Sequence, residues 1–103
     1  MDADLVRRAQ RGDEAAFAVI ADSVIDRFLG AAERILRDPQ LAEDATQQAL
    51  VNVWRSLPDL RDPERFEAWA YRALVRECYA ESKRHRRRDE VPLLPSDRQV
   101  VPD

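Results

Sequence analysis

Several residue types are scarce in this sequence, and each scarcity excludes a class of protein. A single cysteine among 103 residues excludes an internal disulfide and a cysteine-based zinc site. The two glycines lie apart and form no glycine-rich phosphate-binding loop, and no apolar run approaches the roughly 20 residues of a membrane helix. The start, MDADLVRRAQRGDE, is charged throughout and unlike a signal peptide. We therefore expect a cytoplasmic protein that is not inserted in a membrane and holds no metal or cofactor.

No residue pattern indicates catalysis. The one histidine, His85, lies in a basic run with no carboxylate in a sequence relation that suggests an acid–base pair. Cys78 lies on the apolar stripe of its predicted helix, so a place in the core is favoured over a role as nucleophile. We predict that the protein is not an enzyme.

Charged residues are abundant but unevenly distributed. They make up 36% of the chain, with 45% hydrophobic residues, and the frequent alanine, leucine, arginine and glutamate favour helix over sheet. Residues 1–64 hold 8 basic and 13 acidic residues, residues 65–88 hold 8 and 3, and residues 89–103 hold 1 and 4. This segregation predicts one basic face and one or more acidic faces, which bears on partners rather than on fold.

Caps and apolar periodicity predict a first pair of helices. One runs over about residues 3–11 and ends at Gly12, after which Asp13 caps a second helix over about residues 14–37. Gly30 lies within the apolar stripe of the second helix. Because glycine there costs about 1 kcal/mol relative to alanine, it suggests close packing of another helix.

Two further helices begin with the same Asp-Pro dipeptide. The dipeptide at 38–39 caps a helix that ends at Pro58, and the dipeptide at 62–63 opens a fourth helix that continues through the arginine-rich run. Residues 1–88 are thus predicted to form one domain, a compact all-α four-helix bundle. Residues 89–103 contain three prolines and no helical period, and are predicted to be an extended acidic linker.

The third predicted helix carries a polar face with an aromatic residue at its margin. A polar face is ordinarily just solvated, and the helix dipole accounts for acidic residues near the helix start. Trp54 fits two interpretations equally, an interface anchor or a half-buried core residue. The residues that share this face, at spacings of three and four, are Glu43, Asp44, Gln47, Gln48, Val51, Trp54 and Arg55.

The fourth predicted helix interleaves cations with aromatic residues. Cations can neutralise phosphates while aromatic rings stack on unpaired bases, which would indicate nucleic-acid binding. The alternatives are a core stripe of aromatic residues beside an unrelated solvated face, or a nuclear-localisation signal in KRHRRR. The residues that follow one predicted exposed stripe are Arg65, Arg72, Arg76, Tyr79 and Lys83, and the cations of the helix end are Lys83, Arg84, Arg86, Arg87 and Arg88.

Three motifs follow one another in a specific order: LVRRAQRGDEAAFAVI, AEDATQQALVNVW and FEAWAYRALVRECYAESKRHRRR. Over about residues 4–88 they resemble region 2 of a bacterial RNA polymerase sigma factor of the extracytoplasmic-function (ECF) group, in the sigma-70 family. The resemblance implies a transcription initiation factor domain that binds the RNA polymerase core and captures the melted −10 promoter element.

The resemblance implies separate residues for the two partners. Asp44 and Gln47 match the acidic and glutamine positions of the helix that docks on the clamp helices of the polymerase β′ subunit. The implied core-binding set is Glu43, Asp44, Gln47, Gln48, Val51, Trp54 and Arg55. The loop at 60–65 and the start of the fourth helix match the part that holds a flipped-out base, and later positions match the helix facing the single-stranded non-template strand. The implied DNA-binding set is Leu60, Arg61, Asp62, Arg65, Phe66, Trp69, Arg72, Arg76, Tyr79, Lys83, Arg84, Arg86, Arg87 and Arg88.

The chain also departs from the family pattern. Arg76 stands where the family usually has asparagine, so the base preference at this point is open, and Ala70 and Ala73 replace larger residues. The stretch VPLLPSDRQVVPD resembles the start of a linker to a helix-turn-helix domain that reads the −35 element, so we expect the chain to be part of a longer factor. The resemblance further implies an anti-sigma factor as a partner.

Two alternatives to this function remain. The chain could be a sigma-like protein-interaction module, an adaptor or a fragment held by an anti-sigma factor, without specific DNA capture. It could also be a general nucleic-acid-binding helical module. The first alternative does not need the basic stripe over residues 72–88, and the second does not need the acidic and glutamine-rich face over residues 43–48.

Overall fold

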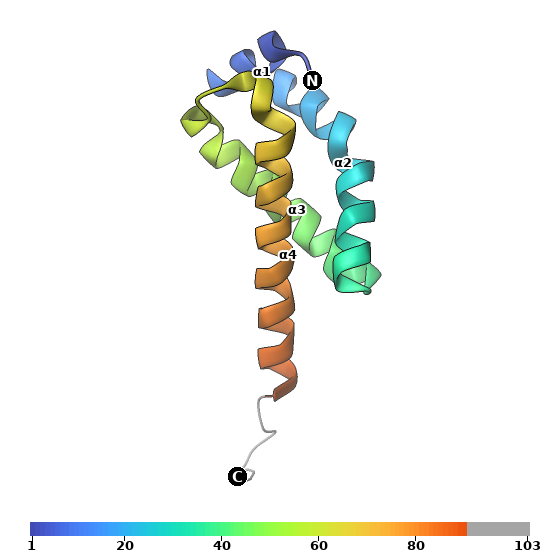
Figure 1. Cartoon of the computed structure of the whole chain (residues 1–103). Helices are drawn as coiled ribbons and strands as arrows, with labels where there is room; N and C mark the ends of the chain where they lie inside the picture. The colour runs from blue at the N-terminus through green and yellow to red at the C-terminus, as the bar shows by residue number, and fades with distance from the viewer. Residues whose placement is uncertain (91–103) are drawn as a thin grey trace.

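Four α-helices make up the part of the chain that the structure describes, which is residues 1–90 (Figure 1). In this computed structural model they are α1 (Ala3–Gln10), α2 (Glu14–Leu36), α3 (Pro39–Ser56) and α4 (Phe66–Glu90), and two 3-10 turns, η1 (Leu57–Asp59) and η2 (Pro63–Arg65), connect α3 to α4. The predicted all-α four-helix architecture is confirmed. The linker was expected from residue 89, but Asp89 and Glu90 still belong to α4, and the remainder lies outside the described residues.

Aspartate side chains begin α2 and α3 where the sequence predicts. The Asp13 carboxylate accepts a hydrogen bond from a backbone N–H of the first turn of α2 at 3.1 Å, and Asp38 does the same for α3 at 2.9 and 3.1 Å. Asp62 differs, because its carboxylate caps the backbone N–H of Glu64 in η2 at 3.0 Å. The first turn after it is 3-10, and α4 begins at Phe66, later than the predicted start at the proline.

The junction of α1 and α2 is fixed by Gly12. Its φ of 96° lies in the left-handed region that glycine adopts readily. The backbone N–H of Gly12 donates to the Ala9 carbonyl at 3.0 Å and that of Asp13 donates to the Arg8 carbonyl at 3.1 Å, which is the Schellman motif. Asp13 also pairs with the Arg8 guanidinium at 3.1 Å. Asp13 thus takes part in the end of α1 through its backbone N–H, begins α2 through its carboxylate, and joins the two helices through Arg8.

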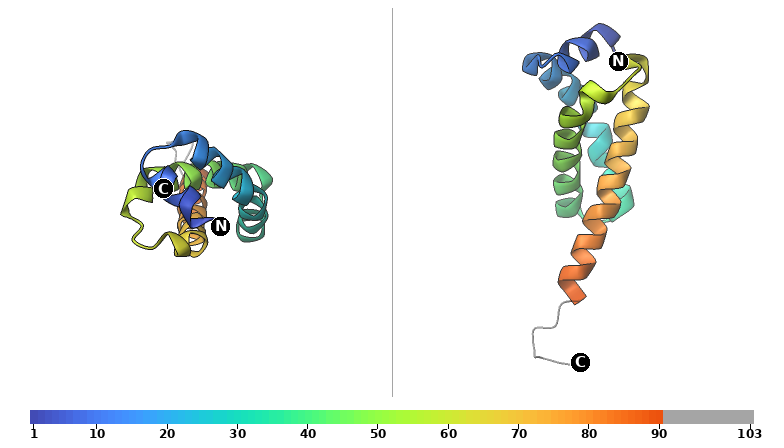
Figure 2. Two further views of the ribbon diagram at one scale, coloured as in Figure 1. Left: turned by 90° about the horizontal axis from the view of Figure 1, so that it is seen from above. Right: turned by 90° about the vertical axis from the view of Figure 1, so that its left-hand side faces the viewer.

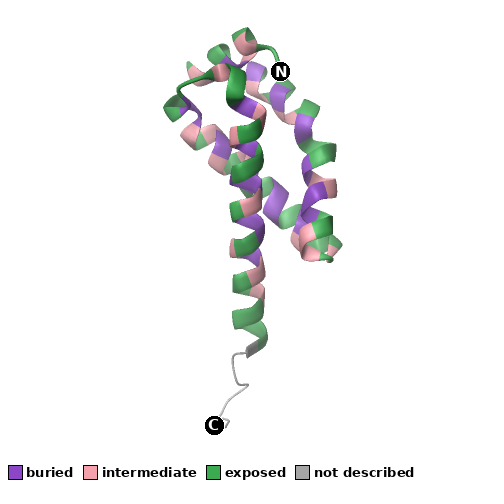
Figure 3. Cartoon of the chain, in the orientation of Figure 1, coloured by how far each residue is buried: buried purple, intermediate pink, exposed green. Residues whose placement is uncertain are grey.

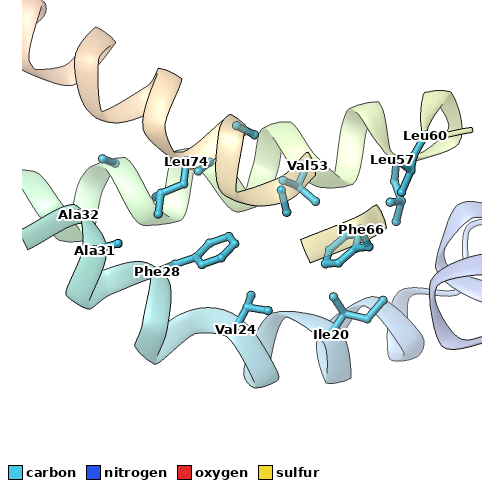
Figure 4. Close-up of a cluster of buried hydrophobic side chains, with 14 of the residues drawn as sticks. Ile20, Val24, Phe28, Ala31, Ala32, Val53, Leu57, Leu60, Phe66 and Leu74 are labelled. Carbon is cyan, nitrogen blue, oxygen red and sulfur yellow. The ribbon is translucent and has the colours of Figure 1, made fainter. Parts of the chain in front are cut away.

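The core lies where α2, α3 and α4 converge, and α1 packs across one end of the bundle (Figures 1 and 2). Figure 4 shows side chains from all three long helices directed into this space, and Phe66 lies among them with 1% of its surface exposed. The largest fully buried side chains are Phe66, Ile20, Leu57, Leu74, Val6, Val24, Val53 and Cys78.

Gly30 does not mark a close approach of another helix, contrary to the expectation from sequence. A Cβ atom built on it would meet only the Arg34 guanidinium of the same helix, at 3.7 Å, which is ordinary van der Waals contact. Its position therefore has room for a methyl group, and the conformation of α2 there does not require glycine.

The last part of α4 extends beyond the other helices (Figures 1 and 3). Glu81 is the last residue of α4 that is buried among those whose side chains the structure describes, and the following cations are exposed. No helix among the described residues is both long enough and apolar enough to span a membrane.

Candidate functional site

The outer face of α3 gathers the residues of the implied core-binding set. Their positions at spacings of three and four turn them away from the buried alanines of the same helix. Glu43, Asp44, Gln47, Gln48, Val51 and Arg55 are exposed, and Trp54 is half-buried. We call these seven residues the α3 face. It presents carboxylates near the helix start, amides along its middle and apolar groups toward its end.

Trp54 is half-buried, with one part of its ring in the core and another at the surface. Its ring packs on Phe17 of α2, with ring centroids 5.0 Å apart, so one side of the indole is part of the core. The other side borders an apolar surface hollow of about 260 Å³ that Val51, itself 40% exposed, also lines. Glu14 and Phe17 of α2 and Leu50 of α3 complete the lining. The end of the α3 face is therefore a depression suited to an apolar side chain.

Local hydrogen bonds order the polar part of the α3 face. The Gln40 amide donates to the Asp44 carboxylate at 3.2 Å, and the Gln48 amide donates to Asn52 at 3.0 Å. All four groups lie on α3, four residues apart in each pair, which is the spacing at which side chains of one helix are neighbours.

A stripe of cations runs along the solvent side of α4. Arg72, Arg76, Lys83 and Arg87 recur at spacings of four, seven and four, and all are exposed. We call these four residues the α4 cation stripe. Within residues 1–89, whose side chains the structure describes, no ion pair involves any of them. Tyr79 lies on the same side and is 64% exposed, so an aromatic face accompanies the free cations.

Arg84 and Arg88 belong to a different side of α4, although the sequence groups them with the other cations. The Arg84 guanidinium donates to Glu77 at 2.7 Å and to Glu81 at 2.6 Å, and these hydrogen bonds raise the pKa of Arg84 above its usual value. Arg88 lies 3.6 Å from Glu81. Both carboxylates are buried, and Glu77 also accepts a hydrogen bond from Asn52 of α3 at 3.2 Å. These two arginines therefore neutralise buried acids of their own helix, and the Asn52–Glu77 hydrogen bond joins this group to α3.

The remaining cations of the helix end have local partners. Arg86 donates to the Ser82 hydroxyl at 2.9 Å. His85 lies 3.3 Å from the Asp89 carboxylate one turn later, a partner that the sequence reasoning did not recognise. Both side chains of this pair are substantially exposed, which is the environment of a surface pair rather than of a catalytic dyad.

The rest of the implied DNA-binding set, in the α3–α4 loop and the start of α4, consists of exposed and buried residues. Arg61, Asp62 and Arg65 are exposed, whereas Leu60 is buried and Phe66 belongs to the core. Phe66 thus follows its place on the apolar stripe and presents no free ring to a base. Trp69 is half-buried, with its ring centroid 6.2 Å from that of Phe66.

Sequence reasoning missed four residues that organise these surfaces: Gln10, Asn52, Glu77 and Glu81. A signal for two of them was present, because extending the apolar stripe of α4 beyond Leu74 leads to Glu77 and Glu81. Gln10 carried no local signal, since its partners lie 47 and 50 residues away.

The other chemically active groups are consistent with a structural role. Cys78 is fully buried, and burial raises the pKa of its thiol, which disfavours the reactive thiolate. Among residues 1–90 no group of three or more histidine, cysteine, aspartate or glutamate side chains is arranged to hold a metal ion.

An all-α bundle with an acidic, amide-rich helix face and a separate cationic helix is the architecture expected from the resemblance to sigma factors. Residues 20–88 match the family model for sigma-70 region 2. The chain belongs to the sigma-70 region 2 family, whose members are domains of transcription initiation factors, and the family assignment from sequence is confirmed.

Individual relatives have sigma-factor names. The RNA polymerase sigma-H factor of Pseudomonas aeruginosa is 35% identical over 74 residues, which are 72% of this chain and 38% of that protein. The ECF RNA polymerase sigma factor SigK of Mycobacterium ulcerans is 38% identical over 55 residues, 53% of this chain and 29% of that protein. SigK of Mycobacterium tuberculosis is 40% identical over 52 residues, 50% of this chain and 28% of that protein. The chain thus spans well under half the length of these relatives, and no solved structure matches it.

Proposed function

We propose that this chain is the region 2 domain of an ECF-type sigma factor. It binds the RNA polymerase core through the α3 face and captures the melted −10 promoter element through the α3–α4 loop and the α4 cation stripe. One observation carries the proposal. The free cations and the acidic, amide-rich surface lie on two different helices that are locked together by the Asn52–Glu77 hydrogen bond and a shared core. Two partners of opposite charge can therefore bind at the same time.

The α3 face has the features of a protein interface. Its apolar hollow at Val51 and Trp54 would hold one anchoring side chain, and the exposed acids and glutamines around it would pair with cations and backbone groups of the partner. A helix that presents cations beside an apolar side chain would have the complementary chemistry, and we assign this role to the clamp helices of β′. Asp44 and Gln47 are the residues on which we expect this contact to depend most.

The loop and α4 have the features of a single-strand binding surface. Arg61, Asp62 and Arg65 are exposed residues of the α3–α4 loop and can contact an unstacked base. The α4 cation stripe begins beyond the loop and continues along α4, with Tyr79 on the same side of the helix. Cations that follow a strand and an aromatic ring that stacks on bases are the two elements of single-strand binding. Phosphate contacts hold the strand in position, and contacts to bases provide sequence selectivity.

Titration with core RNA polymerase tests the first half of the proposal. Replacing both Asp44 and Gln47 with alanine should weaken core binding by tenfold or more, because central interface residues each contribute about 1 kcal/mol or more. Glu33→Ala, an exposed acid on α2 outside the α3 face, is the matched control and should bind as the wild type does. Unchanged core affinity in the double variant would show that the α3 face is not the core-binding surface.

The second half is tested by adding DNA to the polymerase complex. Selection from a pool of randomised single strands identifies a preferred strand, and its affinity is compared with that of a scrambled strand of the same composition. We expect the preferred strand to bind at least tenfold more tightly, since one lost base contact costs about 1–3 kcal/mol. Equal binding of the two strands together with normal core binding would instead support the protein-interaction module.

A further inference from the structure

The α3–α4 loop is fastened from a distant part of the chain. The side-chain amide of Gln10, the last residue of α1, donates one hydrogen bond to the Leu57 carbonyl at 3.0 Å and one to the Leu60 carbonyl at 2.8 Å. An amide nitrogen carries two hydrogens, so both donors of this group are used. We call this arrangement the Gln10 clamp.

The Gln10 clamp acts on a loop that is already anchored by its leucines. The Leu57 side chain is fully buried and that of Leu60 is 9% exposed, and the Leu60 backbone N–H donates to the Leu57 carbonyl at 3.1 Å. The clamp satisfies the carbonyl groups at both ends of this short segment. Beyond it the backbone continues to Arg61 and Asp62, which are exposed. The clamp therefore fixes the point from which the exposed part of the loop projects.

The end of α1 that holds Gln10 is itself well fixed. Val6 and Ala9 are buried, and Gly12 closes the helix with the Schellman motif. α1 also packs against both 3-10 turns of the loop. Gln10 is half-buried and both donors of its amide are bonded to the loop backbone, so its effect on a bound strand would be exerted through the loop.

We propose that Gln10 is a positioning residue that sets the conformation of the α3–α4 loop and thereby the sequence selectivity of single-strand capture. This inference rests on the proposed function. A site that distinguishes bases must be held to within about 0.5 Å of its productive geometry by supporting groups. Contacts to phosphates along the α4 cation stripe do not pass through the loop and should be independent of the clamp.

Two substitutions remove the clamp in different ways. Gln10→Met keeps the length of the side chain and removes both hydrogen bonds, which leaves the Leu60 carbonyl without this donor while the Leu57 carbonyl keeps the Leu60 backbone N–H. Gln10→Glu keeps the shape of the side chain but places a carboxylate opposite two carbonyls. Each variant is studied in complex with core polymerase, with the preferred and scrambled single strands. The ratio of the two dissociation constants should fall about tenfold, while affinity for the scrambled strand and its salt dependence stay at the wild-type values.

Hydrogen exchange gives a readout that does not depend on DNA. The Leu60 amide should exchange faster in both variants, since its acceptor segment is released, while Cys78 stays protected from thiol reagents if the core is intact. Faster exchange with an unchanged selectivity ratio would overturn the inference and leave the proposed function standing, and unchanged exchange would show that Gln10 does not hold the loop. A wild-type chain without any selectivity would overturn both.

Discussion

Replacing Arg76 and Arg87 with glutamine should weaken single-strand binding in a salt-dependent manner, whereas the same exchange at Arg84 and Arg88 should change it little. The four residues come from one arginine-rich helix, and each double variant removes two positive charges. They differ in their surroundings. Arg76 and Arg87 belong to the α4 cation stripe, while Arg84 and Arg88 are engaged with Glu77 and Glu81, at 2.7 and 2.6 Å in the case of Arg84.

The expected magnitude follows from counterion release. Each phosphate neutralised on a single strand contributes about 0.7 to the slope of log affinity against log salt. Loss of two contacts should therefore lower the slope by about 1.4, so that a fourfold rise in salt costs the wild type about sevenfold more affinity than it costs the variant. The Arg84 and Arg88 variant should keep the wild-type slope.

Fluorescence anisotropy of a labelled single strand, measured from about 50 to 200 mM salt, provides the slopes. Urea unfolding must accompany it, because removing Arg84 and Arg88 together leaves the buried Glu77 and Glu81 without their cations and should lower the free energy of unfolding. Equal slope losses in the two double variants would refute the division of the arginines into two sides. A larger loss for Arg84 and Arg88 would mean that their ion pairs open to bind DNA.

Further expectations concern stability. Gly30→Ala should raise the free energy of unfolding by about 1 kcal/mol in urea denaturation, because the site is helical and has room for a methyl group. Gly12→Ala should lower the free energy of unfolding by about 1 kcal/mol or more, because Gly12 has a left-handed φ. A Gly12→Ala variant more stable than the wild type would contradict this. The Cys78 thiol, with its raised pKa and full burial, should react with thiol reagents only through unfolding, so its labelling rate should rise with urea in parallel with the unfolded fraction. The backbone N–H of the first turn of α2 and Arg8 lower the pKa of Asp13, and Arg27 and the N-terminal ammonium lower that of Glu67; since both are lower when folded, their stabilisation is present at neutral pH and is lost as the pH falls below about 4. In the double variant Asp13→Asn and Glu67→Gln, the free energy of unfolding should therefore fall less steeply as the pH is lowered below about 4. An acid transition identical to that of the wild type would argue against a stabilising role of the Asp13 and Glu67 ion pairs.

Much of the fold could be predicted from sequence because its signals are local. The caps at Asp13 and Asp38 act on the first turns that follow them, and the stop at Gly12 depends on a single backbone conformation. The start of α4 was predicted too early because the same Asp-Pro dipeptide is followed by an α-helical turn at Pro39 and by a 3-10 turn at Pro63. The dipeptide alone therefore does not determine the type of turn. Phe66, the first residue of α4, is buried in the core shared by the three long helices, and this contact has no local signature.

The candidate surfaces were predictable only in part, for the same physical reason. The α3 face followed from helical periodicity alone. The offset of Arg84 and Arg88 from the α4 cation stripe as a whole also follows from periodicity. Its meaning depends on Glu77 and Asn52, residues 25 positions apart that meet only in the folded bundle. Gln10 has no periodic relation to its partners and could be found only from the structure.

The last part of α4, which extends beyond the other helices after Glu81 (Figure 1), has a thermodynamic consequence. A free helical segment of nine residues is marginal in water. None of residues 82–89 is itself buried, and this part of the helix carries several like charges in successive turns. Neutralising those charges with phosphates favours the helical state, so strand binding and helix formation at this end are linked equilibria, and each must strengthen the other by the same factor. Changes that raise local helicity without touching DNA should therefore tighten binding, and part of the affinity of this domain is set by the helix–coil balance of its own last turns.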